Sequence, residues 1–182
     1  MATPFEIAQS LIGAGEAPDR AMLEDFLATG GQSLDPVETA WCAAFVNASL
    51  GQAGMEGTGK LNARSFMDWG QPVDQPQQGD VAVFSRGDPN GWQGHVGFFD
   101  GYNDDGTIRV LGGNQGNAVS IASYSPDQLL GFRRGENALA PPPEMAPPEP
   151  QNALAALEGP ASIYDIGGAY RQGKAIYDMR QA

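Results

Sequence analysis

The first third of the chain carries apolar residues at three- and four-residue spacing, which is the spacing of one face of an α-helix. Residues 4–30 contain two such stretches separated by glycine and proline, and they predict two short helices. A third helix is predicted over residues 40–52, with Thr39 as its N-cap. Residues 64–69 fit one or two further helical turns.

Alternating patterns and turn signals replace this spacing after residue 79. The Asn-Asp-Asp-Gly sequence at 103–106 predicts a hairpin turn. Helices followed by sequential strands indicate an α+β fold, in which N-terminal helices pack on a central antiparallel meander of about five strands. The predicted strands cover residues 81–84, 95–102, 107–111, 118–122 and 130–133.

The composition changes again near residue 136. Residues 136–160 are rich in proline, which blocks helices and sheet ladders, so they predict a semi-rigid linker. Residues 161–182 contain spaced isoleucine and tyrosine, and two interpretations stay open: a short amphipathic helix that docks on another protein, or a frayed tail. The domain prediction is therefore a folded unit at 1–135 followed by this linker and terminal segment.

Charge and composition exclude several classes of function. The net charge of −12 argues against a nucleic-acid binder and against adhesion to an anionic membrane, because both need clustered basic residues. No apolar run reaches the roughly 18 residues of a membrane span, and the N-terminus lacks the features of a secretory signal. With one cysteine and one histidine, the chain has no internal disulfide and falls short of a common zinc ligand set, so we predict no metal and no cofactor.

The single cysteine lies where the third helix is predicted to begin. A thiol in the first helical turn meets unpaired backbone N–H groups, which lower its pKa and can hold the oxyanion formed when a carbonyl is attacked. Cys42 is therefore a candidate nucleophile. The alternative is that Cys42 is a small buried hydrophobic residue beside Trp41 and Phe45.

The single histidine lies at the head of the second predicted strand, after a glycine-rich approach. His95 is the candidate base for Cys42, since imidazole is the usual proton acceptor near neutral pH; the alternative is a solvent-facing loop residue. A base histidine needs a partner that fixes its orientation, and the next strand ends in Gly-Gly-Asn-Gln. Asn114 is the expected partner, with Gln115 as a second orienting or oxyanion-binding candidate, although asparagine in such a turn is often only a turn former.

Two further residues are candidates for the wall of a substrate groove. Trp92 lies in a loop rich in Gly, Asn and Pro just before His95, and Arg64 precedes an aromatic stretch. Neither is specific by itself.

Several blocks of sequence occur in a characteristic order. Trp-Cys-Ala-Ala-Phe-Val-Asn is followed by Asn-Ala-Arg-Ser-Phe-Met-Asp-Trp-Gly, Gly-Asp-Val-Ala-Val-Phe, Gly-His-Val-Gly-Phe-Phe and Leu-Gly-Gly-Asn-Gln. Together they resemble the CHAP/NlpC-type cysteine peptidases, and within these a subgroup of small phage and bacterial cell-wall hydrolases. The resemblance extends from about Phe5 to Arg134.

The resemblance implies a papain-like fold and cleavage of amide bonds in peptidoglycan. Carried over to this chain, it makes Cys42 the nucleophile, His95 the general base and then acid, and Asn114 the orienting residue. Many CHAP domains place a glutamate two residues before that asparagine, and this chain has Gly112 there. The orientation of His95 is then expected to depend on Asn114, aided by Gln115.

These observations predict a peptidoglycan hydrolase that forms an acyl-enzyme on Cys42, either an N-acetylmuramoyl-L-alanine amidase or an endopeptidase of the stem peptide or cross-link. Without a signal peptide, we expect a phage endolysin or a virion-associated lysin, located in the virion or host cytoplasm and acting in the periplasm or cell wall. Residues 161–182 would then dock on a virion or tail protein. The alternatives are a catalytically silent structural or binding module of a phage tail or virion, and a secreted antibacterial toxin.

Overall fold

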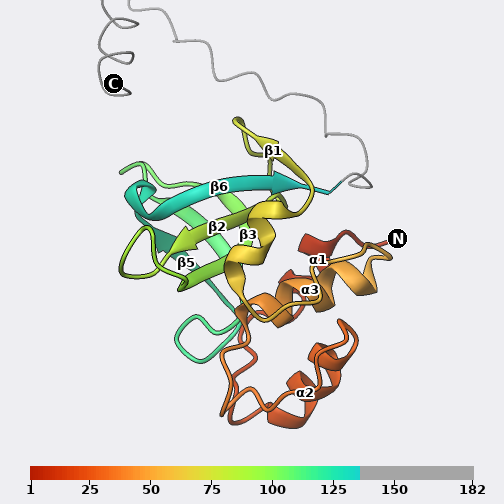
Figure 1. Ribbon diagram of the computed structural model, residues 1–182. Helices are drawn as coiled ribbons and strands as arrows, with labels where there is room; N and C mark the ends of the chain where they lie inside the picture. The colour runs from red at the N-terminus through yellow and green to blue at the C-terminus, as the bar shows by residue number, and fades with distance from the viewer. Residues whose placement is uncertain (136–182) are drawn as a thin grey trace, which may run out of the picture. The chain divides into compact units, whose positions relative to one another are not determined.

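The computed structural model describes residues 1–135, in which helices come first and the strands of one sheet follow (Figure 1). Residues 136–182 lie outside the described residues, and with them the predicted linker at 136–160 and the predicted terminal helix at 161–182. The order of helices and strands confirms the α+β fold expected from the sequence, and it is consistent with a papain-like arrangement.

Three α-helices form where the helical spacing predicts them: α1 (Pro4–Gln9), α2 (Arg20–Ala28) and α3 (Cys42–Gln52). A capping box between Thr3 and Glu6 begins α1, which satisfies backbone amides that a short helix leaves unpaired. Two 3-10 helices, η1 (Ala63–Asp68) and η2 (Pro126–Gln128), complete the helical elements of the described chain.

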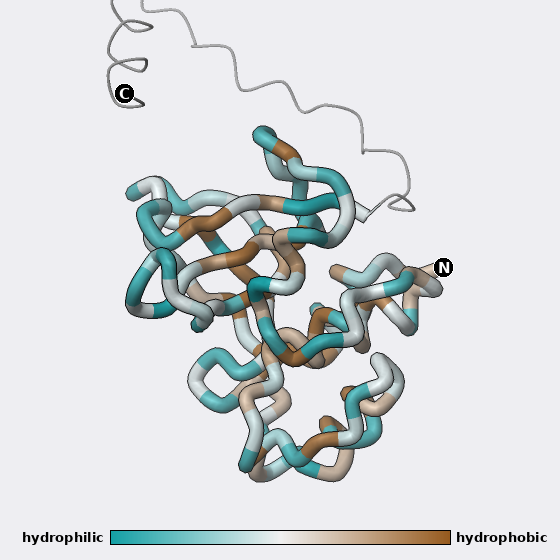
Figure 2. The backbone as a smooth tube through the Cα atoms, viewed as in Figure 1, coloured by the Kyte–Doolittle hydropathy of each residue, from teal (hydrophilic) through white to brown (hydrophobic). Residues whose placement is uncertain are grey.

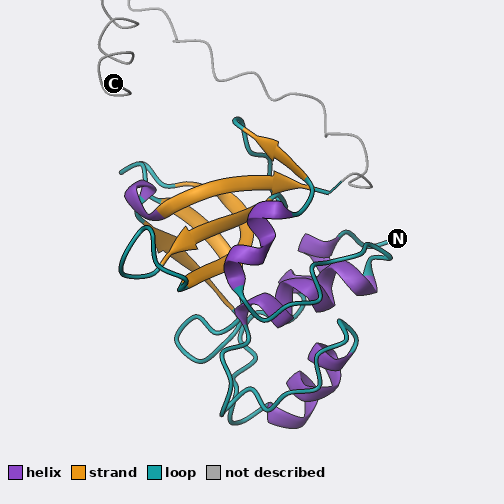
Figure 3. Ribbon diagram, viewed as in Figure 1, coloured by secondary structure: helices purple, strands orange, loops and turns teal. Residues whose placement is uncertain are grey.

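The sheet has six antiparallel strands in the order β1-β6-β2-β3-β4-β5 (Figures 1 and 3). The expected sequential meander holds from β2 to β5. The expectation fails at the last strand, which returns to pair with β2, and a short extra strand adds a sixth member at that edge. The strands are β1 (Gln71–Val73), β2 (Val81–Ser85), β3 (Gly94–Tyr102), β4 (Ile108–Gly112), β5 (Ser120–Tyr124) and β6 (Leu129–Arg134).

Hydrophobic residues bury both faces of this sheet. In the larger core α1 and α3 pack against one face and α2 packs against α3, through residues such as Phe45 and Phe98. A second cluster, which includes Phe84 and Phe99, fills the other face. Figure 2 shows hydrophobic colour along the strands and α3, with hydrophilic colour over most of the loops.

The helix α3 is the central element of the larger core, since every residue from Cys42 to Leu50 is buried. It contacts α1 and α2 as well as β3 and β4. A helix held on several sides keeps its first residue in a fixed position relative to β3. That residue is Cys42.

Candidate active site

Cys42 is the first residue of α3, and its N-cap is Trp41 rather than the expected Thr39. Trp41 has no side-chain capping hydrogen bond, so no side-chain oxygen takes up the amides of the first turn. The backbone amides of Cys42, Ala43 and Val96 are directed at the sulfur, where they favour the thiolate. The thiol therefore lies between the start of α3 and the start of β3.

Burial decides the resting charge of this thiol. Cys42 is only 6% exposed, and the loss of solvent raises the pKa of its thiol above the ordinary value. The three backbone amides and the positive charge of Arg86 lower the pKa but do not offset the burial. The sequence-based expectation that the first helical turn lowers this pKa is thus wrong for the resting protein, because desolvation outweighs the helix terminus.

His95 lies at the start of β3 and is completely buried. Its Nε2 is 2.9 Å from Oε1 of Gln115, and its Nδ1 is 3.2 Å from Nη2 of Arg86. A guanidinium group has donors only, so Nδ1 must accept and the ring proton lies on Nε2, which donates to Gln115. The contacts fix both the orientation and the tautomer of the imidazole.

The imidazole is neutral at neutral pH. Burial is the main cause that lowers the pKa of His95 to about 4; the charge of Arg86 lowers it further, and the hydrogen bond to Gln115 raises it. Among the hydrogen bonds of residues 1–135, none joins the Cys42 sulfur to this ring. The resting site thus holds a neutral thiol and a neutral base.

Both polar atoms of the Gln115 side chain are hydrogen-bonded. Its Nε2 donates to the carbonyls of Ser120 at 2.6 Å and Val110 at 3.2 Å, while Tyr124 Oη donates to its Oε1 at 3.0 Å. The ring of Tyr124 stacks on His95, with centroids 5.1 Å apart and 14° between the planes. Burial raises the pKa of Tyr124 to about 12, so the phenol keeps the proton it donates.

The structure gives the contact with His95 to Gln115 and not to Asn114. Asn114 is half-buried in the turn after β4 with φ of +57°, and its side chain makes no hydrogen bond with any described residue. Gln115, one residue later, turns inward and is 8% exposed. The expectation for Asn114 is therefore corrected, since the conformation of the turn decides which of two adjacent amides faces the ring.

Gly112 explains how Gln115 gains this place. A Cβ at residue 112 would lie 3.1 Å from Oε1 of Gln115 and 3.3 Å from Nε2 of His95. A glutamate at this position would begin in the space that the glutamine amide occupies. Glycine at position 112 thus leaves the space in which the Gln115 amide contacts His95.

Comparison with known proteins adds the family. The sequence model of the CHAP domain matches residues 34–114, a segment that contains Cys42, His95 and Asn114 and ends one residue before Gln115. By this match, residues 34–114 form a CHAP domain. No curated protein and no solved structure matches the chain. The CHAP domain implies a hydrolase that acts on peptidoglycan.

The two residues expected to line a groove lie on or against one loop of the CHAP domain, residues 86–93. Arg64 donates hydrogen bonds to the carbonyls of Asp88, Pro89 and Gln93, so it anchors this loop from η1. Trp92 is 76% exposed on the same loop. In the described part of the chain, neither side chain forms a hydrogen bond with Cys42 or His95. Trp92 presents an uncovered aromatic face beside the strand that carries the histidine.

Arg86 and Tyr124 were missed by the sequence interpretation. Arg86 follows β2 directly, and the β2–β3 pairing sets Ser85 opposite Gly94, so the arginine reaches the hairpin end that carries His95. It is the single Lys or Arg between Arg64 and Arg109, a signal that could have drawn attention to it. Tyr124 gives no comparable signal, because its place depends on the pairing of β5 with β4.

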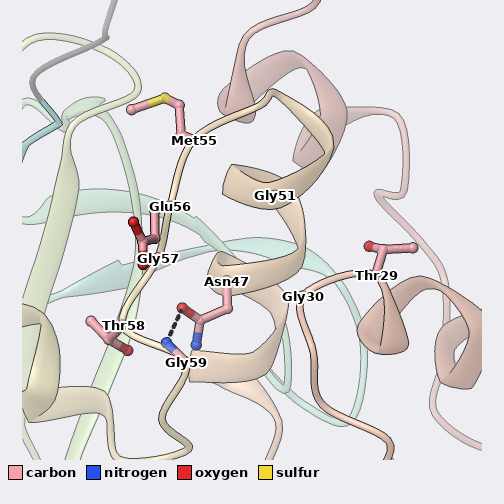
Figure 4. A pocket seen from close by; sticks show the side chains of 9 residues that line it. All are labelled: Thr29, Gly30, Asn47, Gly51, Met55, Glu56, Gly57, Thr58 and Gly59. Atoms are coloured by element: carbon pink, nitrogen blue, oxygen red, sulfur yellow. Dashed lines mark hydrogen bonds between the residues drawn. The ribbon is translucent and has the colours of Figure 1, made fainter.

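A separate hollow of about 240 Å³ lies beside α3, away from these residues (Figure 4). Asn47 crosses it, accepting from the Gly59 amide at 3.2 Å and donating to the Lys60 carbonyl at 3.0 Å. These bonds fasten the loop after α3, so the hollow is a structural feature of the helix packing. Its lining residues are Thr29, Gly30, Asn47, Gly51, Met55, Glu56, Gly57, Thr58 and Gly59.

Within residues 1–135, no group of three or more His, Cys, Asp or Glu side chains is arranged to hold a metal ion. The helices of this part of the chain are too short or too polar to cross a membrane.

Proposed function

We propose that this protein cleaves an amide or peptide bond of peptidoglycan by nucleophilic catalysis, through an acyl-enzyme on Cys42. One observation carries the proposal: a cysteine at the first position of a buried helix, with backbone amides directed at its sulfur, lies against the start of the strand that carries a histidine of fixed tautomer. This combination supplies a nucleophile, a base and donors for an oxyanion.

In the first half of the reaction, the sulfur of Cys42 attacks the scissile carbonyl carbon while the thiol proton passes to Nδ1 of His95. The carbonyl oxygen becomes an oxyanion, which the backbone amides at the start of α3 can hold. When the C–N bond breaks, the imidazolium gives its proton to the leaving amine. The acyl group remains on the sulfur as a thioester.

In the second half, water attacks the thioester while Nδ1 of His95 accepts its proton. The C–S bond breaks, the carboxylic acid leaves, and the proton returns to the sulfur. Gln115 acts through His95 in both halves as a positioning residue, since its Oε1 accepts a hydrogen bond from Nε2–H in both the neutral and the charged ring.

The test uses purified peptidoglycan, the wild-type protein and the variants Cys42→Ser and Cys42→Ala. We expect wild type to release fragments and both variants to lose at least about 1000-fold in rate. Mass spectrometry of the new termini distinguishes an amidase, which frees the lactoyl carboxyl group, from an endopeptidase of the stem peptide or cross-link. Absence of new termini with folded wild-type protein would contradict the proposal and favour a silent binding module.

The setting of this activity stays a prediction: release as a phage endolysin, transport in a virion, or secretion as an antibacterial toxin. The segment expected to dock on a virion or tail protein, residues 161–182, lies outside the described residues.

A further inference from the structure

Arg86 forms no ion pair within the described residues. Arg20, Arg109 and Arg134 pair with carboxylates there, whereas Arg64 and Arg133, like Arg86, do not. Arg86 pairs with none of the carboxylates in residues 1–135, although the protein has a net charge of −12. Its guanidinium lies on Nδ1 of His95 instead, at 3.2 Å.

This position blocks the nitrogen that the proposed reaction needs. The lone pair of Nδ1 can accept one proton donor, and the guanidinium holds it, so the thiol of Cys42 has no free base. Arg86 is the charged group whose field reaches His95, Cys42 and Tyr124 together. The contact therefore keeps the ring neutral and opposes transfer of the thiol proton to it, although the same positive charge lowers the pKa of the Cys42 thiol.

The same side chain is the part of the site that solvent reaches. Arg86 is exposed, whereas His95 and Cys42 are buried, so a substrate that approaches from solvent meets the guanidinium first. Arg64 fixes the carbonyls of Asp88, Pro89 and Gln93 in the loop that follows. A long flexible side chain on an anchored loop can move without moving the loop.

We propose that Arg86 is a receptor for a carboxylate of the substrate and that it covers His95 until such a carboxylate draws it away. A guanidinium binds a carboxylate through two parallel hydrogen bonds, which are stronger than one bond to a neutral imidazole. Once Arg86 has turned to the carboxylate, Nδ1 is free to accept the thiol proton. The substrate class is thus an acyl donor with a free carboxylate near the scissile carbonyl, as peptidoglycan stem peptides have, and this assignment of the substrate rests on the proposed function.

The receptor is tested on the full chain with two alkylating agents that differ only in charge, iodoacetate and iodoacetamide. Each reacts with the Cys42 thiolate: a C–S bond forms, the C–I bond breaks, iodide leaves and the thiol proton goes to solvent. Because Cys42 is the only cysteine, the mass added to the protein by thiol alkylation reports on this one site. The ratio of the two rate constants is independent of the fraction of thiolate, so it reports recognition of the carboxylate alone.

We expect the ratio of iodoacetate to iodoacetamide rates to fall roughly threefold to tenfold in Arg86→Gln, with Arg86→Lys in between. Arg20→Gln removes the same charge from the exposed surface of α2 and should leave the ratio as in wild type. An unchanged ratio in folded Arg86→Gln would overturn the receptor. A changed ratio in a protein that cleaves no peptidoglycan would instead refute the proposed function and leave the receptor standing.

The contact by which Arg86 covers Nδ1 of His95 can be measured separately, because His95 is the only histidine. The ¹⁵N signals of its imidazole give the tautomer and the pKa directly. In wild type we expect the Nε2–H tautomer and a pKa of about 4, and in Arg86→Gln a raised pKa. Equal pKa values in the two proteins would overturn the cover.

Discussion

Gln115 holds the orientation of the imidazole through a network that the residue beside it does not share. Its amide oxygen accepts from His95 and Tyr124, and its amide nitrogen donates to two backbone carbonyls. Fully satisfied buried amides of this kind fix one geometry, because any rotation leaves a donor or an acceptor without a partner. The side chain of Asn114 has no such bonds.

The two adjacent amides should therefore differ sharply when each is removed. Gln115→Ala is expected to lower kcat on peptidoglycan fragments about 100-fold, because the ring loses the acceptor that fixes its tautomer. Asn114→Gly keeps the turn, since glycine tolerates φ of +57°, and should retain activity within about threefold. The measurement is kcat from the rate of new amino termini.

A control separates orientation from stability in this comparison. Gln115→Glu keeps an acceptor for His95 but loses the hydrogen bonds that the amide donates to Ser120 and Val110. It should therefore have a lower free energy of unfolding than wild type and yet a higher kcat than Gln115→Ala. If Asn114→Gly lost as much activity as Gln115→Ala, the assignment of the orienting contact to Gln115 would be refuted.

The buried neutral His95 links stability to pH. Its pKa of about 4 in the folded protein lies below the ordinary 6.5, so the unfolded chain takes up a proton first as the pH falls. The stability that comes from burying the neutral ring is present above pH 6.5 and is lost between about pH 6.5 and pH 4. Between pH 7.5 and pH 5 this loss amounts to about 2 kcal/mol in the free energy of unfolding.

Urea unfolding of wild type and His95→Gln at the two pH values measures this loss. The 22 acidic residues titrate in both proteins, so the difference between the two pH dependences isolates the histidine. We expect wild type to lose about 2 kcal/mol more than the variant. Parallel pH dependences would mean that the folded histidine titrates normally.

At the scale of elements, the start of α3 is fixed by the turn after β4. A Cβ on Gly113 would overlap the ring of Trp41, 2.7 Å from its Cε3, and would lie 2.8 Å from Cβ of Phe45; both of these side chains are fully buried. The turn thus packs against the N-cap of the helix that carries the cysteine. The close approach of these two side chains to the backbone of the turn leaves room for glycine alone.

Gly113→Ala should accordingly cost about 2–3 kcal/mol in the free energy of unfolding and slow the alkylation of Cys42. The extra methyl displaces Trp41, which directly precedes the thiol. Gly116→Asn is the matched control: nothing lies within 4 Å of residue 116 and asparagine tolerates its φ of +64°, so the cost should be below about 1 kcal/mol. Equal costs at the two glycines would show that contact with Trp41 is not the cause.

Elements that depend on local pattern could be predicted, and those that depend on distant partners could not. Spacing and alternation predicted α3 and the strands β2 to β4 to within about two residues, since each has its own buried face. The pairing of β6 with β2 joins segments about 50 residues apart, and β1 is too short and exposed to show alternation. Neither the β6–β2 pairing nor the strand β1 can be predicted from the residue pattern of a short segment.

The candidate site divides in the same way. Cys42 and His95 are marked by residue type and by position within one element, and the structure brings both to the junction of α3 and β3. Whether Gln115 or Asn114 contacts His95 depends on the conformation of one turn, and the contact of Arg86 with His95 depends on the register of a hairpin. Those two are decided by geometry between elements, which the pattern of one segment does not contain.

At the scale of the whole molecule, residues 1–135 contain the contacts described above for the site and the two hydrophobic clusters. The last strand is fastened before residue 135, since Arg134 donates two hydrogen bonds to Asp80, at 2.7 and 2.6 Å. Asp80 also accepts from the Gln77 amide at 2.7 Å, which closes the turn into β2. The end of the sheet is thus held by its own residues.

A chain that ends after Gly135 should therefore fold and keep the alkylation rate of Cys42 within about twofold of the full chain. The matched control ends after Gly131, which removes Phe132 from the second cluster and Arg134 from Asp80; we expect it to be unfolded or strongly destabilised. Circular dichroism and the rate with iodoacetamide provide the two readouts. Loss of reactivity in the longer fragment would show that residues 136–182 belong to the folded unit.

The burial of the Cys42 thiol also bears on how long the protein stays usable before it meets a substrate. Peroxide oxidises cysteine through the thiolate, first to the sulfenic acid and then irreversibly to higher acids. A thiol that is buried, uncharged and separated from its base offers little thiolate to an oxidant. Burial is what keeps this sulfur uncharged, so the one thiol on which the chemistry depends should resist oxidation in an aerobic medium until a substrate reaches the site.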